Sequence, residues 1–361
     1  MQQHTMSLDA QAEMVVDEGV GENLDQLSTI DMRGDGVLRV LYRAARDRRR
    51  APQSLVAARS LLQRVNRGDR VLILTGFLSP KPLPETDGLI GSAVFAAALE
   101  RARGAVPVFV SESEVIPPLA AGLTGAGLNV VTDLDAAKTR PHAAVTLEFD
   151  AIKGEERHRA DEIASLVAPS ACLAVERPGA NSKGEYHFAM GKNVSSDIAP
   201  IDFLYEAVRK AGALTVGVGD FGNELGMGAI YDAVRAETPA GADCGCGCGG
   251  GTACPTAADV TVVVSVSDWG AYAISACLAH LVRDPAVLIG ADAYRRVCDA
   301  VVAAGAIDGP SQYAIPHIDG IDFQFNANLL EVMRGAIRYP TRTQTHSPIR
   351  LFRAGRIGTE A

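Results

Sequence analysis

Residues 214–228 read LTVGVGDFGNELGMG, an apolar run that gives way to closely spaced glycines. A short apolar segment bounded by glycine predicts a buried strand, and the turn after it presents Asp220, Asn223 and Glu224. A helix is expected after the turn. Five glycines and three polar side chains in so short a segment indicate a ligand site rather than packing alone.

The same turn matches the dinucleotide fingerprint G-x-G-x-x-G, with Gly217, Gly219 and Gly222 at the glycine positions. That fingerprint requires a second strand that ends in an acidic residue about 20 residues further on. Here a helix and a cysteine-rich loop fill the interval, and Asp220 would face a pyrophosphate with the wrong charge. We therefore expect no nucleotide, although a nucleotide-dependent enzyme is kept as an alternative. A hard metal ion or an ammonium group fits the acidic turn better.

Near-continuous apolar runs alternate with helical patterns along most of the chain. This alternation predicts an α/β fold with a doubly wound, mostly parallel sheet that helices cover on both faces, in a single large domain. We expect an acidic lead-in over residues 1–36, loose or with a short helix, then the α/β domain over 37–340 and a C-terminal tail over 341–361. The predicted strands are residues 70–75, 105–110, 128–132, 143–149, 171–175, 214–218 and 260–266.

Polar residues follow most of these strands. In an open α/β sheet, ligands bind beyond the carboxyl ends of the strands, so these residues are expected to converge on one site. For Asp87, capping of the following helix is an equal alternative. The segments concerned are residues 76–77 with 85–88, 111–112, Glu148 with Asp150, 176–179, 220–224 and 267–270.

The composition excludes several classes of protein. The chain has 361 residues, of which 47% are hydrophobic, and a net charge of −9. Nucleic-acid binding is not expected, because it needs clustered Lys and Arg, and the basic run at residues 43–50 is better explained as a solvated helix end. The longest apolar runs are too short to span a membrane. Seven cysteines form no secreted disulfide framework, which favours a cytoplasmic location.

Residues 244–254, CGCGCGGGTAC, form an unusual run. A thiolate metal site is one interpretation. The C-x-C spacing differs from the usual C-x-x-C, and the sequence offers no second pair of cysteines to complete a site. We therefore favour a flexible glycine loop, with a redox-sensitive or nucleophilic thiol as an alternative. His187 and His317 are interpreted as ordinary loop histidines, with acid–base or binding roles as the alternative.

Several of these segments together resemble the D-glutamate cyclase family, in particular its carboxy-terminal catalytic domain. The chain departs from the family pattern at Leu89, Phe221 and Asp268, where the family has proline, glycine and asparagine. The matching segments are residues 75–77 (TGF), 85–88 (ETDG), 176–179 (ERPG), 184–186, 190–191, 219–228, the cysteine loop, 269–272 (WGAY) and the pairs at 308–309 and 319–320.

The resemblance implies a lyase that converts D-glutamate to 5-oxo-D-proline and water, or a related lactam-forming or lactam-opening reaction on an acidic amino acid. Such a site needs a base for the amine and a cation or acid for the carboxylate. A divalent metal, Mg²⁺ or Mn²⁺, could polarise that carboxylate, with Asp220 and Glu224 as ligands. A non-catalytic amino-acid-binding module is a further alternative function. Whatever the function, the chain could form a homo-oligomer.

The expected roles of individual residues follow the same resemblance. Catalytic roles are assigned to Asp220, Glu224, Glu176 and Asp87. Arg177 is expected to clamp a substrate carboxylate in bidentate fashion, with a salt bridge to a loop carboxylate as the alternative. The residues expected to bind substrate are Asn223, Arg177, Glu85, Thr86, Gly222 and Trp269.

Overall fold

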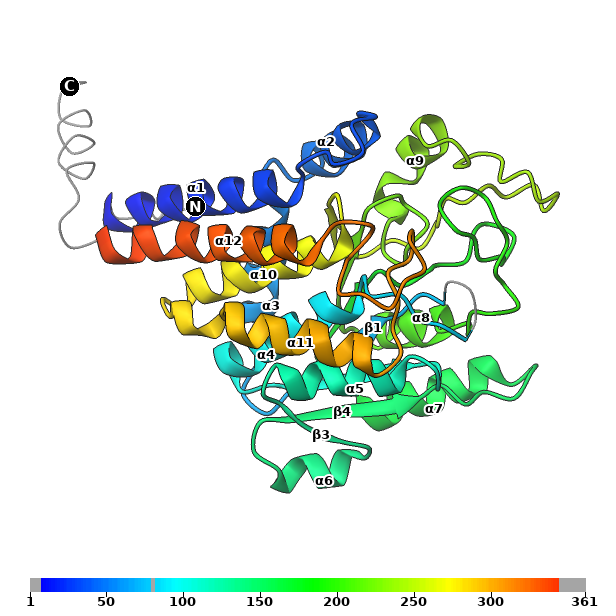
Figure 1. Ribbon diagram of the computed structural model, residues 1–361, viewed down its shortest axis with the longest axis horizontal. Coiled ribbons are helices and arrows are strands. Elements are labelled where there is room, and N and C mark those ends of the chain that lie inside the picture. The colour runs from blue at the N-terminus through cyan, green and yellow to red at the C-terminus, as the bar shows by residue number, and fades with distance from the viewer. Residues whose placement is uncertain (1–7, 79–81, 344–361) are drawn as a thin grey trace, which may run out of the picture.

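The computed structural model describes residues 8–78 and 82–343 (Figure 1). Its centre is one sheet of seven parallel strands in the order β3-β4-β2-β1-β5-β6-β7. This confirms the predicted doubly wound α/β fold in a single domain. The strands are β1 (Arg70–Thr75), β2 (Val106–Ser111), β3 (Asn129–Val131), β4 (Ala143–Glu148), β5 (Ala171–Val175), β6 (Leu214–Gly219) and β7 (Val260–Val263).

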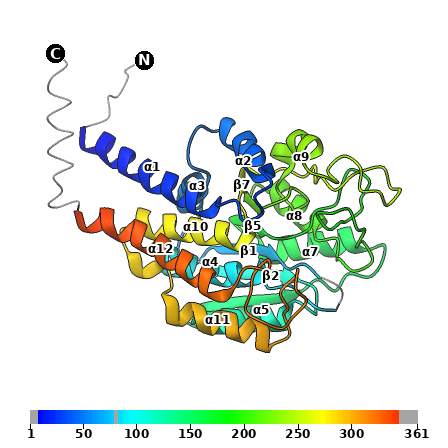
Figure 2. The ribbon, with the colours of Figure 1, turned by 45° about the horizontal axis from the view of Figure 1, so that its top comes forward.

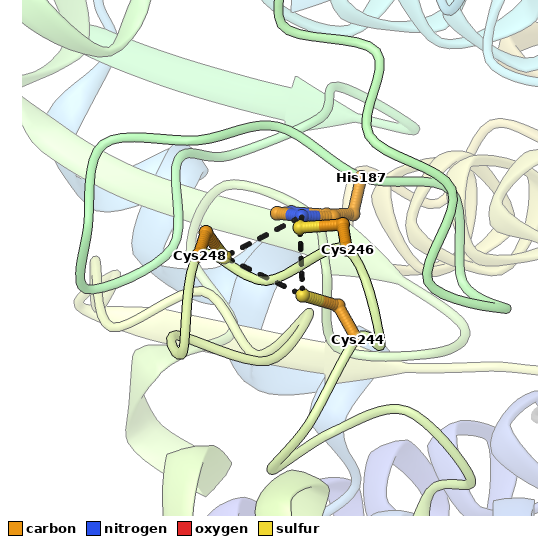
Figure 3. A group of neighbouring side chains, drawn as sticks. All are labelled: His187, Cys244, Cys246 and Cys248. Carbon is orange, nitrogen blue, oxygen red and sulfur yellow. Dashed lines mark hydrogen bonds between the residues drawn. The ribbon is translucent and has the colours of Figure 1, made fainter.

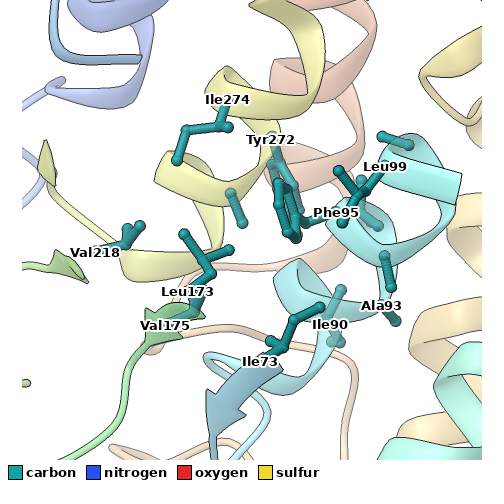
Figure 4. Close-up of a cluster of buried hydrophobic side chains, with 14 of the residues drawn as sticks. Ile73, Ile90, Ala93, Phe95, Leu99, Leu173, Val175, Val218, Tyr272 and Ile274 are labelled. Atoms are coloured by element: carbon teal, nitrogen blue, oxygen red, sulfur yellow. The ribbon is translucent and has the colours of Figure 1, made fainter. Parts of the chain in front are cut away.

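Alternate strand residues supply two separate cores. On β1, Leu72 and Leu74 join the core under α7 and α8, whereas Ile73 joins the larger core on the opposite face. In Figure 4, side chains of the central strands meet those of α4 and α10 in this larger core. The helices are α1 (Leu8–Ser28), α2 (Val37–Asp47), α3 (Gln53–Arg64), α4 (Leu89–Arg103), α5 (Ile116–Gly125), α6 (Leu134–Thr139), α7 (Glu156–Val167), α8 (Asp202–Lys210), α9 (Tyr231–Glu237), α10 (Ser267–Leu281), α11 (Ala291–Ala303) and α12 (Phe323–Thr343).

The N-terminal segment is more ordered than its sequence predicts. Instead of a loose lead-in with a short helix, α1 runs for 21 residues and lies along α10 and α12 (Figures 1 and 2). Val20 and Leu24 are buried, and Asp25 accepts hydrogen bonds from the backbone N–H groups of Gln53 and Ser54 at the start of α3. The proposed domain boundaries stay a prediction, and residues 344–361 of the expected tail lie outside the described residues.

Helix α10 begins earlier than predicted. The sequence predicts a strand to residue 266 followed by a strand-end segment at 267–270, but β7 ends at Val263 and α10 starts at Ser267. The segment 267–270 is therefore the first turn of a buried helix and not a strand-end loop. Among the helices of the described residues, none has the length and apolar character needed to cross a membrane.

Candidate active site

Carboxylates from adjacent strand ends meet beyond the sheet. Glu176 follows β5, and Asp220 and Glu224 follow β6; one carboxylate oxygen from each lies within 4.8 Å of the other two. The two loops are bonded together, because Gly179 N donates to Asn223 O at 2.8 Å and Leu225 N donates to Arg177 O at 2.8 Å. The parallel pairing of β5 with β6 thus fixes the separation of the three carboxylates.

Glu224 fills the turn that resembles a nucleotide-binding loop. Its Oε1 accepts from the backbone N–H groups of Asp220 and Phe221, both at 3.0 Å, and its Oε2 accepts from Gly222 N at 2.7 Å. These are the donors that would hold a phosphate. A Cβ at Gly219 would lie 2.6 Å from Glu224 Oε2, so this glycine makes room for a carboxylate. Burial and the charge of Asp220 raise the pKa of Glu224 to about 8.

Asp87 and Asp268 cap each other's helices. Asp87 Oδ1 accepts from Asp268 N at 2.9 Å at the start of α10, while Asp268 Oδ1 accepts from Gly88 N and Gly91 N at 2.8 and 2.7 Å at the start of α4. Burial raises the pKa of Asp268 to about 7; burial and the charge of Asp268 raise that of Asp87 well above its ordinary value. The capping alternative for Asp87 is thus observed on α10, and the same Oδ1 also accepts from Gly88 N at 2.9 Å, at the start of α4. Its catalytic role stays a prediction.

Two more carboxylates extend the group. Burial raises the pKa of Glu85 well above its ordinary value, and so do the charges of Asp87 and Asp319. Asp319 lies in the segment between α11 and α12. Burial and the charges of Asp220 and Asp87 raise its pKa well above the ordinary value. We call Glu85, Asp87, Glu176, Asp220, Glu224 and Asp319 the acidic cluster. So many neighbouring carboxyl groups cannot all ionise without a cation.

Arg33 is the functional candidate that sequence reasoning missed. It lies between α1 and α2, its Nη1 is 2.9 Å from Asp220 Oδ2 and 3.9 Å from Asp319 Oδ2, and its guanidinium stacks 4.1 Å from the centre of the Phe221 ring. Nothing in the sequence links this arginine to the turn some 190 residues later, although Phe221 had been noted as a departure from the family.

The Arg177 guanidinium pairs with Glu112 and with no carboxylate of the acidic cluster. The side chain is fully buried, and its two terminal nitrogens contact the two Glu112 oxygens at 2.7 and 2.8 Å, while Gly76 O and Ala199 O accept further bonds. This is the salt-bridge alternative that the sequence left open. Trp269 is also fully buried, and its Nε1 donates to Asn326 at 2.7 Å.

Some buried polar atoms around the site have no hydrogen-bond partner among the described residues, and two of them are oxygens. These two are Asn223 Oδ1 and the Thr75 hydroxyl; the other end of the Asn223 amide donates to His187 O at 3.1 Å. A buried polar group without a hydrogen bond lowers the stability of the protein, so these atoms mark a place where a bound ligand could supply the missing hydrogen bonds. Thr86, in contrast, donates to His317 O at 2.6 Å and fixes the loop that carries Glu85.

The strand-end residues on β4 do not join the site. Asp150 is exposed and pairs with Arg159 at 2.7 Å, and Glu148 is exposed at the end of the strand. For the cysteine loop, the sequence favoured a flexible glycine loop over a thiolate metal site, and the structure adds a histidine that the sequence did not connect with it. His187 lies against Cys244, Cys246 and Cys248, a second cluster discussed below.

A sheet of seven parallel strands with the acidic cluster at its strand ends defines an α/β domain with a candidate ligand site at the carboxyl edge of the sheet. The chain belongs to the D-glutamate cyclase-like family, because the model of that family's C-terminal domain matches residues 24–334. The chain is also 30% identical over 228 residues to the human protein named D-glutamate cyclase, mitochondrial. That match covers 60% of this chain and 33% of the human protein, so it spans about a third of the relative's length.

Proposed function

We propose that this domain is a lyase that closes, or opens, the lactam ring of an acidic amino acid, as in the conversion of D-glutamate to 5-oxo-D-proline and water. The observation that carries the proposal is the acidic cluster, which lies on the family's own motifs and has an excess of carboxylates over cations. Such a site favours a substrate that brings an ammonium group.

The acidic cluster could carry out the two proton transfers that the reaction requires. In ring closure, nitrogen loses two protons, attacks the side-chain carboxyl carbon, and one carboxyl oxygen leaves with both protons as water. The reaction therefore consumes no external proton, but it needs a group that takes a proton from nitrogen and returns one to oxygen. A carboxyl group with a raised pKa is suited to both steps.

Glu176 is the best candidate for this proton carrier. Burial, with the charges of Asp220 and Glu224, raises its pKa well above the ordinary value. Ser267 Oγ donates to Oε2 at 2.6 Å and orients the carboxyl group, which leaves the other oxygen for substrate. Its backbone φ of 44° is a strained conformation for a residue other than glycine, as is common at functional sites.

The carboxyl group under attack must lose its negative charge, and the family resemblance suggested Mg²⁺ or Mn²⁺ for this purpose. The donor set fits: carboxylate oxygens of Asp220 and Glu224, which lie within 4.8 Å of each other, suit a hard cation. Glu224 already accepts three backbone hydrogen bonds, so one of its roughly four lone-pair sites stays free. When bound there, such an ion would polarise the substrate carboxyl group.

Arg33 and Asn223 complete the proposed substrate contacts. The guanidinium of Arg33 is the cation held against Asp220, and it can pair with a substrate carboxylate. The unpartnered Asn223 Oδ1 can accept a hydrogen bond from the ammonium group. A nucleotide would have to displace the Glu224 carboxylate from the turn, so the geometry opposes that alternative.

The test is incubation of the purified protein with D- and L-glutamate, their lactams and analogues, with and without Mg²⁺ or Mn²⁺. Mass spectrometry should detect the gain or loss of one water, and E176Q and D220N should reduce the rate by 100-fold or more. D150N changes a strand-end carboxylate outside the cluster and should leave the rate unchanged. No turnover, with stabilisation by an amino acid that D220N does not alter, would support a binding module instead.

A further inference from the structure

The cysteine loop and a distant histidine form a compact group. We call it the Cys₃His cluster. Its ligand atoms all lie within 4.8 Å of one another (Figure 3). Its members are His187, Cys244, Cys246 and Cys248.

The separations suit a single tetrahedral ion. The Cys244 sulfur lies 3.1 Å from that of Cys246 and 3.4 Å from that of Cys248, and His187 Nε2 lies 3.3 and 3.8 Å from the last two sulfurs. Two thiolates that share one Zn²⁺ at 2.3 Å are about 3.8 Å apart, and a thiolate and an imidazole about 3.6 Å. The four ligands of an iron–sulfur cluster are divided among two or more irons, so they do not all converge on one point as these four do.

The backbone is shaped to bring the three thiols to one side. Gly245 and Gly247, which separate the cysteines, have φ angles of 71° and 90°, a conformation that side chains other than glycine rarely adopt. The chain therefore curls after each cysteine. This explains why the spacing is C-x-C instead of C-x-x-C, and why the sequence alone did not indicate a complete site.

Donors surround the sulfur of Cys248 as they surround metal-bound thiolates. Asn181 Nδ2 and Gly250 N each donate to it at 3.4 Å. Asn181 also donates to Gly251 O at 2.7 Å, so the same amide holds the loop in place. Outer contacts of this kind orient metal ligands. All the cysteines of the described residues are free thiols.

We propose that the Cys₃His cluster binds one Zn²⁺ as a closed, structural site. Four protein ligands leave no open position for substrate, which distinguishes it from a catalytic zinc. The ion would join the loop around His187 to the cysteine loop.

The proposed zinc site is linked to the acidic cluster. His187 O accepts from the Asn223 amide, and the ring of the next residue, Phe188, stacks on Phe77 at 5.0 Å, just after β1. The ion would therefore restrict the motion of the loop around His187 and Phe188, which holds the Asn223 side chain in place. This role does not depend on the reaction that the acidic cluster performs.

Zinc content and spectroscopy of the full chain test the site. Protein purified without chelators should contain about one Zn²⁺ per chain, released on mercurial modification of the thiols. Co²⁺ in its place should give a thiolate-to-cobalt charge-transfer band. C246A should lose the metal, the band and several degrees of Tm, although Cys246 is exposed and its removal leaves no cavity.

C254A is the matched control, because Cys254 belongs to the same loop but is buried outside the cluster. This variant should keep the zinc, and any fall in Tm should come only from the packing contacts of the buried side chain that it removes. E176Q should also keep it, since that variant alters the acidic cluster. Zinc-free protein whose Tm does not respond to added Zn²⁺ would overturn the proposal. Stoichiometric zinc retained in C246A, or a disulfide within the cluster, would overturn it as well.

Discussion

Replacing Asp268 by asparagine should stabilise the protein at neutral and alkaline pH and have almost no effect at pH 4. Asp268 is fully buried, and its Oδ1 accepts the N–H groups of Gly88 and Gly91 at the start of α4. The amide oxygen of asparagine can accept the same two bonds. Its nitrogen replaces Oδ2, which faces the Tyr272 hydroxyl at 3.4 Å, and that hydroxyl can accept as well as donate.

The magnitude follows from the pKa of Asp268. Burial raises that pKa from an ordinary value of 3.8 to about 7, so the folded state binds the proton more tightly than the unfolded state does. Stability from this group is therefore complete at low pH and is lost as the pH rises from about 4 to about 7. The full loss is about 4 kcal/mol.

Asparagine carries no charge at any of these pH values, so the variant avoids the loss. We expect a gain of about 2–4 kcal/mol at pH 8, because the buried amide must still be accommodated against Tyr272. For a chain of 361 residues this corresponds to roughly 3–5 °C in Tm.

The assay is thermal unfolding of wild type and D268N between pH 4 and 8. The difference in Tm should grow across that range and level off above pH 7. D268A removes the cap altogether and should be less stable than wild type at pH 4. A difference in Tm between D268N and wild type that does not vary with pH would refute the reasoning, because it would place an ordinary pKa on Asp268.

Three further changes test the surroundings of the acidic cluster. R33A should reduce kcat/KM by about 10- to 100-fold through loss of a charged hydrogen bond, whereas R33K should recover part of it; steady-state kinetics that find no change would contradict a substrate contact. R177M should lower the free energy of unfolding by about 3–5 kcal/mol, since it leaves the Glu112 charge buried, and E112Q in the same chain should restore part of this in urea denaturation; an unchanged stability with a raised KM would support the clamp instead. G219A should displace the Glu224 carboxylate from the turn and cost about 1–3 kcal/mol; a Tm equal to that of wild type would contradict the close contact.

The strands were predictable because each is a short apolar run whose alternate residues face two cores. β1 and β5 fall on the expected residues, and the other five differ by a few residues at their ends. The start of α10 was not predictable from its own sequence. Its first turn is held by Asp87, which lies some 180 residues earlier, and local patterns do not contain such contacts.

The acidic cluster was predictable in part for a similar reason. Parallel strands end at a common edge, so Glu176, Asp220 and Glu224 had to lie close together once the sheet was recognised. The cysteine loop lacked its fourth ligand in the sequence, because His187 is brought to it by tertiary contacts alone. The hydrogen bond from Asn223 to His187 O makes these two clusters neighbours.

The contact between Arg33 and Phe221 suggests how this chain could differ from its family in substrate. The family pattern has glycine at the position of Phe221, and a glycine offers no ring for a guanidinium to stack on. Here the ring holds Arg33 at 4.1 Å and so directs its charge onto Asp220. F221G should release Arg33, weaken binding of a substrate carboxylate and widen the site. If F221G instead leaves KM and the preference among acidic amino acids unchanged, Phe221 is not a determinant of specificity.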